Sequence, residues 1–272
     1  MPDQNYSDPV ARLLNAGDPR SRLEWLDYPQ VYGLTLQDVP ELIRMACDEL
    51  SFELDADEDV SVYRNVHAWR ALGQLRAAEA AEPLTGLLRW VDEEDDDWVN
   101  DDLPCVLAMI GPTSLAPLGT FLADAQRGVF GRVAAIEGLR LLAEEYPGSR
   151  AECLAAISST LQHFAENDPD LNAFLIDALA DLKVVEAAPL VEQAFKSDRV
   201  ELSIRGDWED FQVDVGLLPE RLTEPEYGLW LDEPEPIEKN LLRAAHPEDK
   251  KAKAKRKQEK KSRKQNRKKK KK

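Results

Sequence analysis

Apolar residues recur at the spacing of one helical face in several separate stretches of the chain. Between residues 103 and 110 they fall at i, i+3, i+4 and i+7, and the stretches 84–91, 118–125 and 171–182 repeat this spacing. Such a pattern places the apolar side chains on one side of an α-helix. Runs in which β-branched residues alternate with polar ones are nearly absent, so the pattern predicts an all-α fold.

Three prolines mark corners between these helices. Pro83 and Pro117 are 34 residues apart, and Pro117 and Pro189 are 72 apart, which is twice 36. A proline in a helix interior costs about 3 kcal/mol, whereas in the first turn its missing N–H costs nothing. Each proline therefore predicts the start of a second helix. A period near 35 residues predicts a repeat of helix pairs.

The rest of the body fits the same repeat less closely. Residues 132–164 read as a degenerate copy with a longer corner, EEYPGS, and residues 35–50 read as a second helix that starts at Val39-Pro40. Residues 8–15 suit a capping helix, and the irregular stretch 200–218 has the size of a C-terminal cap. We expect a right-handed α-solenoid of about four to five helix pairs over residues 1–220.

Beyond the repeats, the composition changes twice. Residues 221–248 are acidic and rich in proline and predict a linker, and residues 249–272 are rich in lysine and predict a disordered tail. The net charge of −17 hides two opposed parts, because residues 250–272 hold 16 Lys and Arg against one acid. The remaining 249 residues hold 19 basic and 51 acidic residues, a net of −32. The acidic body predicts a protein partner with a basic or mixed surface.

The basic tail predicts a weak contact with RNA or ribosomes that is independent of sequence, with no DNA sequence specificity. The alternative is a tail that folds back on the acidic body, and both hypotheses can be true at once. The candidate cations for polyanion binding are Lys255, Arg256, Lys257, Lys260, Lys261, Arg263, Lys264, Arg267 and Lys268.

An acidic run, 92–97, precedes Trp98. It is either a site for a divalent cation or a basic partner, or a solvated loop in which Asp96 or Asp97 caps the next helix. The run lacks the alternating acids, the glycine and the terminal glutamate of a calcium loop, which favours the capping interpretation. The three histidines do not pair with cysteines at ligand spacing, and no nucleophile, phosphate or dinucleotide motif is present. We therefore expect no metal, no cofactor and no catalytic residue.

Aromatic residues outside the main apolar stripes are the better functional signal, because aromatics are common at interface hot spots. They are Tyr28, Tyr32, Trp98, Trp208, Tyr227 and Trp230. For Trp98 and Trp208 a role in binding a partner is weighed equally with a role in anchoring a helix start. Tyr227 and Trp230 fall in the linker and form a candidate docking motif.

The chain also carries signals of its compartment. Its three cysteines are few and scattered, which is typical of reduced thiols in the cytoplasm. The N-terminus does not resemble a signal peptide, and no apolar run approaches the ~18 residues of a membrane span.

Several segments resemble a bacterial family of HEAT-like-repeat proteins of unknown function. They are VPELIRMACDE, HAWRALGQL, DDDWVNDDLP, IGPTSLAPL, LNAFLIDALADL and VEAAPLVEQAF, together with RVELSIRGDWEDFQ. The resemblance implies a helical-repeat fold and a role in protein interaction, without an activity. The repeats are also similar to those of phycobilin lyases, so chromophore handling is one alternative function. A nucleic-acid-associated or ribosome-associated role through the tail is the other.

Overall fold

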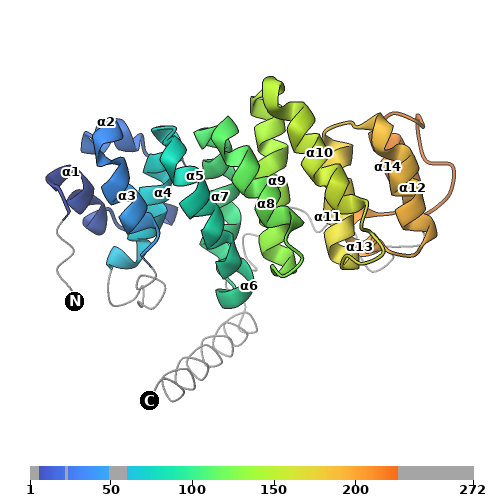
Figure 1. The fold of residues 1–272 in the computed structure, drawn as a ribbon, viewed down its shortest axis with the longest axis horizontal. Helices are drawn as coiled ribbons and strands as arrows, with labels where there is room; N and C mark the ends of the chain where they lie inside the picture. Colours follow the sequence, from blue (N-terminus) through green and yellow to red (C-terminus); the bar gives the residue numbers. More distant parts are fainter. Residues whose placement is uncertain (1–5, 22–23, 49–59, 226–272) are drawn as a thin grey trace, which may run out of the picture. The chain divides into compact units, whose positions relative to one another are not determined.

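The structure is a computed structural model that describes residues 6–21, 24–48 and 60–225, all of which belong to one compact unit. These ranges contain helices and no strand (Figure 1), which confirms the all-α prediction. The residues after 225, which include the tail and all of the expected linker except residues 221–225, lie outside the described part.

Fourteen α-helical segments follow one another in the described ranges. They are α1 (Asp8–Ala11), α2 (Tyr28–Tyr32), α3 (Val39–Ala46), α4 (Arg64–Gln74), α5 (Ala81–Gly86), α6 (Trp90–Glu94), α7 (Asp97–Ile110), α8 (Leu115–Ala123), α9 (Val129–Glu145), α10 (Arg150–Leu161), α11 (Pro169–Asp181), α12 (Ala188–Lys196), α13 (Leu202–Arg205) and α14 (Trp208–Asp214). Short 3₁₀ turns are η1 (Arg12–Asn15), η2 (Pro19–Ser21), η3 (Leu36–Asp38), η5 (Val60–Tyr63), η6 (Ala78–Ala80), η7 (Leu87–Arg89), η8 (Pro112–Ser114), η9 (Pro147–Ser149) and η10 (Val185–Ala187).

The predicted corners are present. The helices α3, α5, α8, α10 and α12 each follow directly on a 3₁₀ turn, namely η3, η6, η8, η9 and η10. Pro40, Pro83, Pro117 and Pro189 lie at the second or third position of their helices, where the missing N–H has no helical partner to lose. The 3₁₀ turn before each second helix is a shared feature that the apolar spacing did not predict.

The corners come in two lengths. At Arg76 and Lys183 the chain takes a left-handed conformation, with φ of 51° and 54°, and three residues separate the helix from the 3₁₀ turn. In the two shorter corners, a single residue separates the helix from the 3₁₀ turn. This residue is Gly111, with φ of 100°, in one corner and Tyr146 in the other. The prediction of a longer corner at EEYPGS is therefore wrong. Glu144 and Glu145 still belong to α9, which leaves only Tyr146 between that helix and the 3₁₀ turn.

The helices pack in two layers. In one layer, α4, α7, α9 and α11 contact one another in chain order, and α11 also contacts α13 and α14. In the other, α3, α5, α8 and α10 contact their neighbours in the same way, and each contacts a helix of the first layer (Figure 1). Trp69, Leu107, Leu139 and Leu175 are buried in a single continuous core. Full burial of such a side chain contributes about 1.5–3 kcal/mol.

The C-terminal cap is more regular than the sequence suggested. Residues 200–218 contain two short helices, α13 and α14, in place of the expected irregular chain. The reason is local: Glu201 accepts the N–H of Ser203, and Asp207 forms a capping box with Asp210. A capped helix start satisfies backbone donors that otherwise lack partners, so even a helix of seven residues is stabilised here.

Candidate partner-binding surface

The acidic run before Trp98 acts as a pair of helix caps. Asp96 accepts hydrogen bonds from the backbone N–H of Trp98 at 2.9 Å and of Val99 at 3.1 Å, at the start of α7. The predicted cap by Asp96 is thereby confirmed, whereas the predicted loop is wrong for most of the run, because residues 92–94 belong to α6 and Asp97 is the first residue of α7. Asp92 accepts from the N–H of Phe130 at 3.0 Å and of Gly131 at 2.7 Å, at the start of α9. In the described ranges, no group of three or more His, Cys, Asp and Glu side chains is arranged to hold a metal ion.

Trp98 belongs to a group of three aromatic rings and two guanidinium groups, which we call the aromatic–arginine cluster: Trp25, Tyr63, Trp98, Arg20 and Arg70. The rings of Tyr63 and Trp98 meet edge to face, 5.9 Å between centroids. The Arg20 guanidinium lies over Tyr63 at 5.7 Å and over Trp98 at 5.6 Å. The Arg70 guanidinium lies over Trp25 at 4.5 Å and over Trp98 at 5.6 Å. All four distances are within the range of cation–π attraction.

A buried carboxylate, that of Asp102, fixes the side chain of Arg70. Its Nε and Nη2 donate to the two oxygens of Asp102 at 2.6 and 3.0 Å, and the indole Nε1 of Trp69 donates to the same carboxylate at 3.1 Å. The two side chains of the ion pair are only 7% and 9% exposed. A two-point contact of this kind is strong and directional. It holds α4 against α7 and fixes the guanidinium against the rings of Trp25 and Trp98.

Arg20 is held at the surface instead. Its Nε and Nη2 donate to Asp18 at 3.0 and 2.7 Å, and Nη2 donates to the hydroxyl of Tyr63 at 2.7 Å. The Tyr63 hydroxyl in turn donates to Asp18 at 3.1 Å. Hydrogen bonding from Arg20 lowers the pKa of Asp18 to about 2. The Arg20 side chain is nevertheless 65% exposed, so it covers the cluster from the solvent side.

Next to this cluster, Tyr28 and His67 form a buried pair. The Nε2 of His67 lies 2.9 Å from the carbonyl oxygen of Gly17, and a carbonyl only accepts, so Nε2 carries the proton. Its Nδ1 then accepts from the hydroxyl of Tyr28 at 2.7 Å. Burial lowers the pKa of His67 and raises the pKa of Tyr28 to about 12, so both stay neutral. The prediction that Tyr28 lies outside the core is wrong. Tyr32 is half-buried and stacks on Tyr28.

Trp208 lies in a different part of the molecule. It is half-buried and stacks on Phe211, with 5.6 Å between centroids and 14° between planes, and Phe195 lies at 6.4 Å. It therefore serves as an anchor at the start of α14, and its role in binding stays a prediction.

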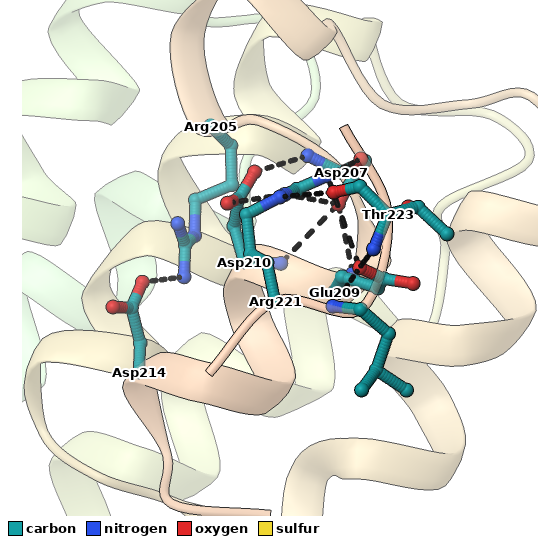
Figure 2. A network of polar contacts seen from close by, with 8 residues as sticks. Arg205, Asp207, Glu209, Asp210, Asp214, Arg221 and Thr223 are labelled. Carbon is teal, nitrogen blue, oxygen red and sulfur yellow. Dashed lines mark hydrogen bonds and ion pairs between the residues drawn. The ribbon is translucent and has the colours of Figure 1, made fainter. Parts of the chain in front are cut away.

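Beside Trp208, three carboxylates surround Arg221, a group that we call the carboxylate cluster: Asp207, Glu209, Asp210 and Arg221 (Figure 2). Arg221 bonds to Asp207 at 2.7 Å and to Asp210 at 2.5 Å. The N–H groups of Leu222 and Thr223 each donate to Glu209 at 3.0 Å. Arg221 lowers the pKa of Asp207, and these N–H donors lower the pKa of Glu209. Residues 221–223, which the composition places in the linker, thus bond to α14.

Arg205 and Asp214 form a separate ion pair next to this cluster, at 2.6 Å (Figure 2). Arg205 also lies 3.6 Å from Asp177 of α11. Its own side chain is 6% exposed, while its two acidic partners are about half exposed. This arginine joins α13, α14 and α11.

Of the two predicted partner-binding residues that the structure describes, Trp98 lies in the aromatic–arginine cluster and Trp208 packs on Phe211 and Phe195. Tyr227, Trp230 and the nine candidate cations of the tail lie outside the described residues. The sequence analysis missed Arg20, Trp25, Tyr63 and Arg70. One signal was present, because the charge of Arg70 stands between the apolar pairs Ala68-Trp69 and Ala71-Leu72, where a buried charge needs a partner.

Three comparisons with known proteins identified no similar protein. A scan against protein-family models, a search of curated proteins and a search of solved structures each found no match. Among the described helices, none alone has the length and apolar content to cross a bilayer, although 97–110 and 112–123 pass that test together as a pair bent by 119°.

Proposed function

We propose that this protein is a non-enzymatic scaffold that binds another protein through the aromatic–arginine cluster. The cluster carries the proposal because Trp, Tyr and Arg are the residue types that dominate interface hot spots. Its two arginines, Arg20 and Arg70, are already held by Asp18 and Asp102. A binding surface whose side chains are ordered beforehand loses less conformational entropy on association.

The stacked helix pairs support the scaffold role. We propose a right-handed α-solenoid of four to five HEAT-like pairs, because the recurring corners and the contacts between successive pairs are those of a helical repeat. A cytoplasmic location is part of the same proposal. Burial raises the pKa of the Cys153 thiol to about 11, as suits a reduced structural cysteine.

The proposed partner has a basic or mixed surface. Outside residues 250–272 the sequence carries a net charge of −32. Close to Trp98 in the chain, Asp97 and Asp101 are exposed, as are Glu24 and Asp27 close to Trp25. Acidic residues around a hot spot speed association with a basic surface and disfavour an acidic one.

Site-specific photocrosslinking in the native cell tests this function. A photoreactive residue replaces Asp101, three positions after Trp98, and in a matched control it replaces the exposed Glu152 of α10. We expect one protein to be crosslinked from position 101 and not from 152. The Trp98→Ala variant should lose the product while retaining a cooperative melt. Equal products from both positions, or a product that survives Trp98→Ala, would contradict the proposal.

A second, weaker function is proposed for the tail, supported by its 16 cations against one acid. We expect weak RNA binding with a steep salt dependence, because each phosphate neutralised on a single strand contributes about −0.7 to the log–log slope. Removal of residues 249–272 should abolish it without a loss of helix content by circular dichroism. Binding that persists after this truncation would place the RNA contact on the helices.

A further inference from the structure

Tyr63 and Trp98 already hold an arginine, and that arginine belongs to the chain itself. The Arg20 guanidinium lies over both rings, and it bonds to Asp18 and to the Tyr63 hydroxyl. We infer that Asp18, Tyr63 and Trp98 form a binding site for an arginine side chain of the partner protein, and that Arg20 occupies this site until the partner arrives. The inference rests on the proposed function and names the group that the surface recognises.

The exposure of Arg20 makes the exchange feasible. Its side chain is 65% exposed, and its carboxylate partner Asp18, two residues away in the chain, is 37% exposed. Ion pairs at this exposure contribute little to stability, so Arg20 leaves at small cost. Arg70 lies over the same Trp98 ring but is 7% exposed and sealed by Asp102. The cluster thus contains one arginine that is part of the core and one that is exchangeable.

The contacts of Arg20 define which cation the site selects. Its Nε and Nη2 reach the carboxylate of Asp18 together, Nη2 also reaches the Tyr63 hydroxyl, and the planar group lies over two rings. A guanidinium makes these contacts at once because it is flat and carries several donors in fixed directions. A lysine ammonium is a point charge without that fork. The partner is therefore a protein segment with an exposed arginine, in keeping with the basic surface proposed above.

The test empties the site and offers it two small peptides. The Arg20→Ala variant and the wild-type full chain are titrated with N-acetyl-Gly-Arg-Gly-amide and with the matching lysine peptide. The indole N–H signal of Trp98 is followed by NMR, assigned with a Trp98→Phe variant. We expect Arg20→Ala to bind the arginine peptide roughly five- to tenfold more tightly than the wild type, because no internal arginine competes. The lysine peptide should show no such gain.

Arg127→Ala is the matched control. Arg127 also pairs with a nearby aspartate, Asp124, at 3.0 Å and lies over a ring, that of Phe121, at 4.9 Å. Its removal should leave arginine-peptide binding at the wild-type level. A second variant, Arg20→Gln, repeats the test with a side chain closer in size and serves if Arg20→Ala melts early.

Two results would overturn the inference: equal affinity of Arg20→Ala and wild type for the arginine peptide, or an equal gain for the lysine peptide. The second would reduce the effect to general attraction by the acidic body. Either result leaves the proposed scaffold function intact if the crosslink from position 101 is still formed and still depends on Trp98. Loss of that crosslink, in contrast, removes the scaffold proposal itself.

Discussion

Two arginines at different ends of the described chain are each held by carboxylates, and they are held in opposite ways. Arg70 meets a single aspartate, Asp102, and both side chains are less than a tenth exposed. Arg221 meets Asp207, Asp210 and Glu209 (Figure 2). All four side chains are between 20% and 29% exposed. The Arg70 ion pair is buried and has one carboxylate, whereas Arg221 is reached by solvent and shares three carboxylates.

The difference shows where the loss of one charge strongly destabilises the fold and where it has only a small effect on stability. A buried ion pair gains little over an apolar pair, but breaking it is costly because the remaining charge has lost both water and partner. Arg221 keeps two acidic partners when one is removed, and solvent reaches all of them. The Arg70–Asp102 contact therefore makes the structure depend on one residue, whereas the carboxylate cluster spreads the same task over several.

The largest expected effect follows from removing the charge of Asp102. Asp102→Asn keeps the shape of the side chain but leaves Arg70 buried without a countercharge and places an amide group against its donors. We expect the free energy of unfolding to fall by about 3 kcal/mol or more, measured by urea denaturation. The double variant Arg70→Met with Asp102→Leu should recover part of this loss. A change below about 1 kcal/mol for Asp102→Asn would show that water reaches the pair in solution.

A smaller loss is expected from the neighbouring neutral pair. Tyr28→Phe removes the hydroxyl that donates to Nδ1 of His67 and leaves a buried acceptor without a partner. The expected cost is about 1–3 kcal/mol, again by urea denaturation. Tyr32→Phe, on a half-buried ring next to it, is the control and should stay within about 0.5 kcal/mol of the wild type. Equal effects of the two variants would indicate that the Tyr28–His67 bond is absent.

The open cluster should respond less. Arg221→Gln removes the cation shared by Asp207 and Asp210, and we expect the melting temperature to fall by at most about 4 °C near neutral pH. Arg221 is the main cause of the lowered pKa of Asp207, so the stabilisation that Asp207 gains from Arg221 is present above its ordinary pKa near 4 and is lost as the pH falls through the lowered value. The difference between wild type and Arg221→Gln should therefore shrink below about pH 4. A difference that grows on acidification would contradict the role of these carboxylates.

The fold was largely predictable because its signals are local. A proline in the first turn of a helix is a property of a few neighbouring residues, so Pro83, Pro117 and Pro189 identify their corners without any tertiary information. The 3₁₀ turns and α14 were not predicted because they are too short to show an apolar period. The capping pair of Asp207 and Asp210 was the available signal for α14.

The candidate surface was predictable only in part, because its contacts cross long stretches of chain. Arg20 and Tyr63 are 43 positions apart, and Arg70 and Asp102 are 32 apart. Trp98 stood out as an aromatic residue after an acidic run. Nothing in the sequence near Trp98 indicates that two arginines approach its ring, since that depends on how α4, α7 and η2 pack.

The smallest expected effect concerns Asp18, whose pKa of about 2 depends first on its hydrogen bond from Arg20. In Arg20→Ala we expect the pKa of this carboxyl, followed by carbon NMR, to rise toward its ordinary value near 3.9. Stability should hardly change, because the pair is exposed and its contribution is lost only between about pH 4 and 2. Asp124 provides the comparison: the N–H of Gln126, at 3.0 Å, is the main cause of its lowered pKa. Arg127→Ala should therefore leave the pKa of Asp124 low. A pKa of Asp18 that stays near 2 in Arg20→Ala would show that the backbone N–H of residue 20, which donates to Asp18 at 2.8 Å and remains in the variant, holds the carboxylate together with the Tyr63 hydroxyl. The side chain of Arg20 would then not set this pKa.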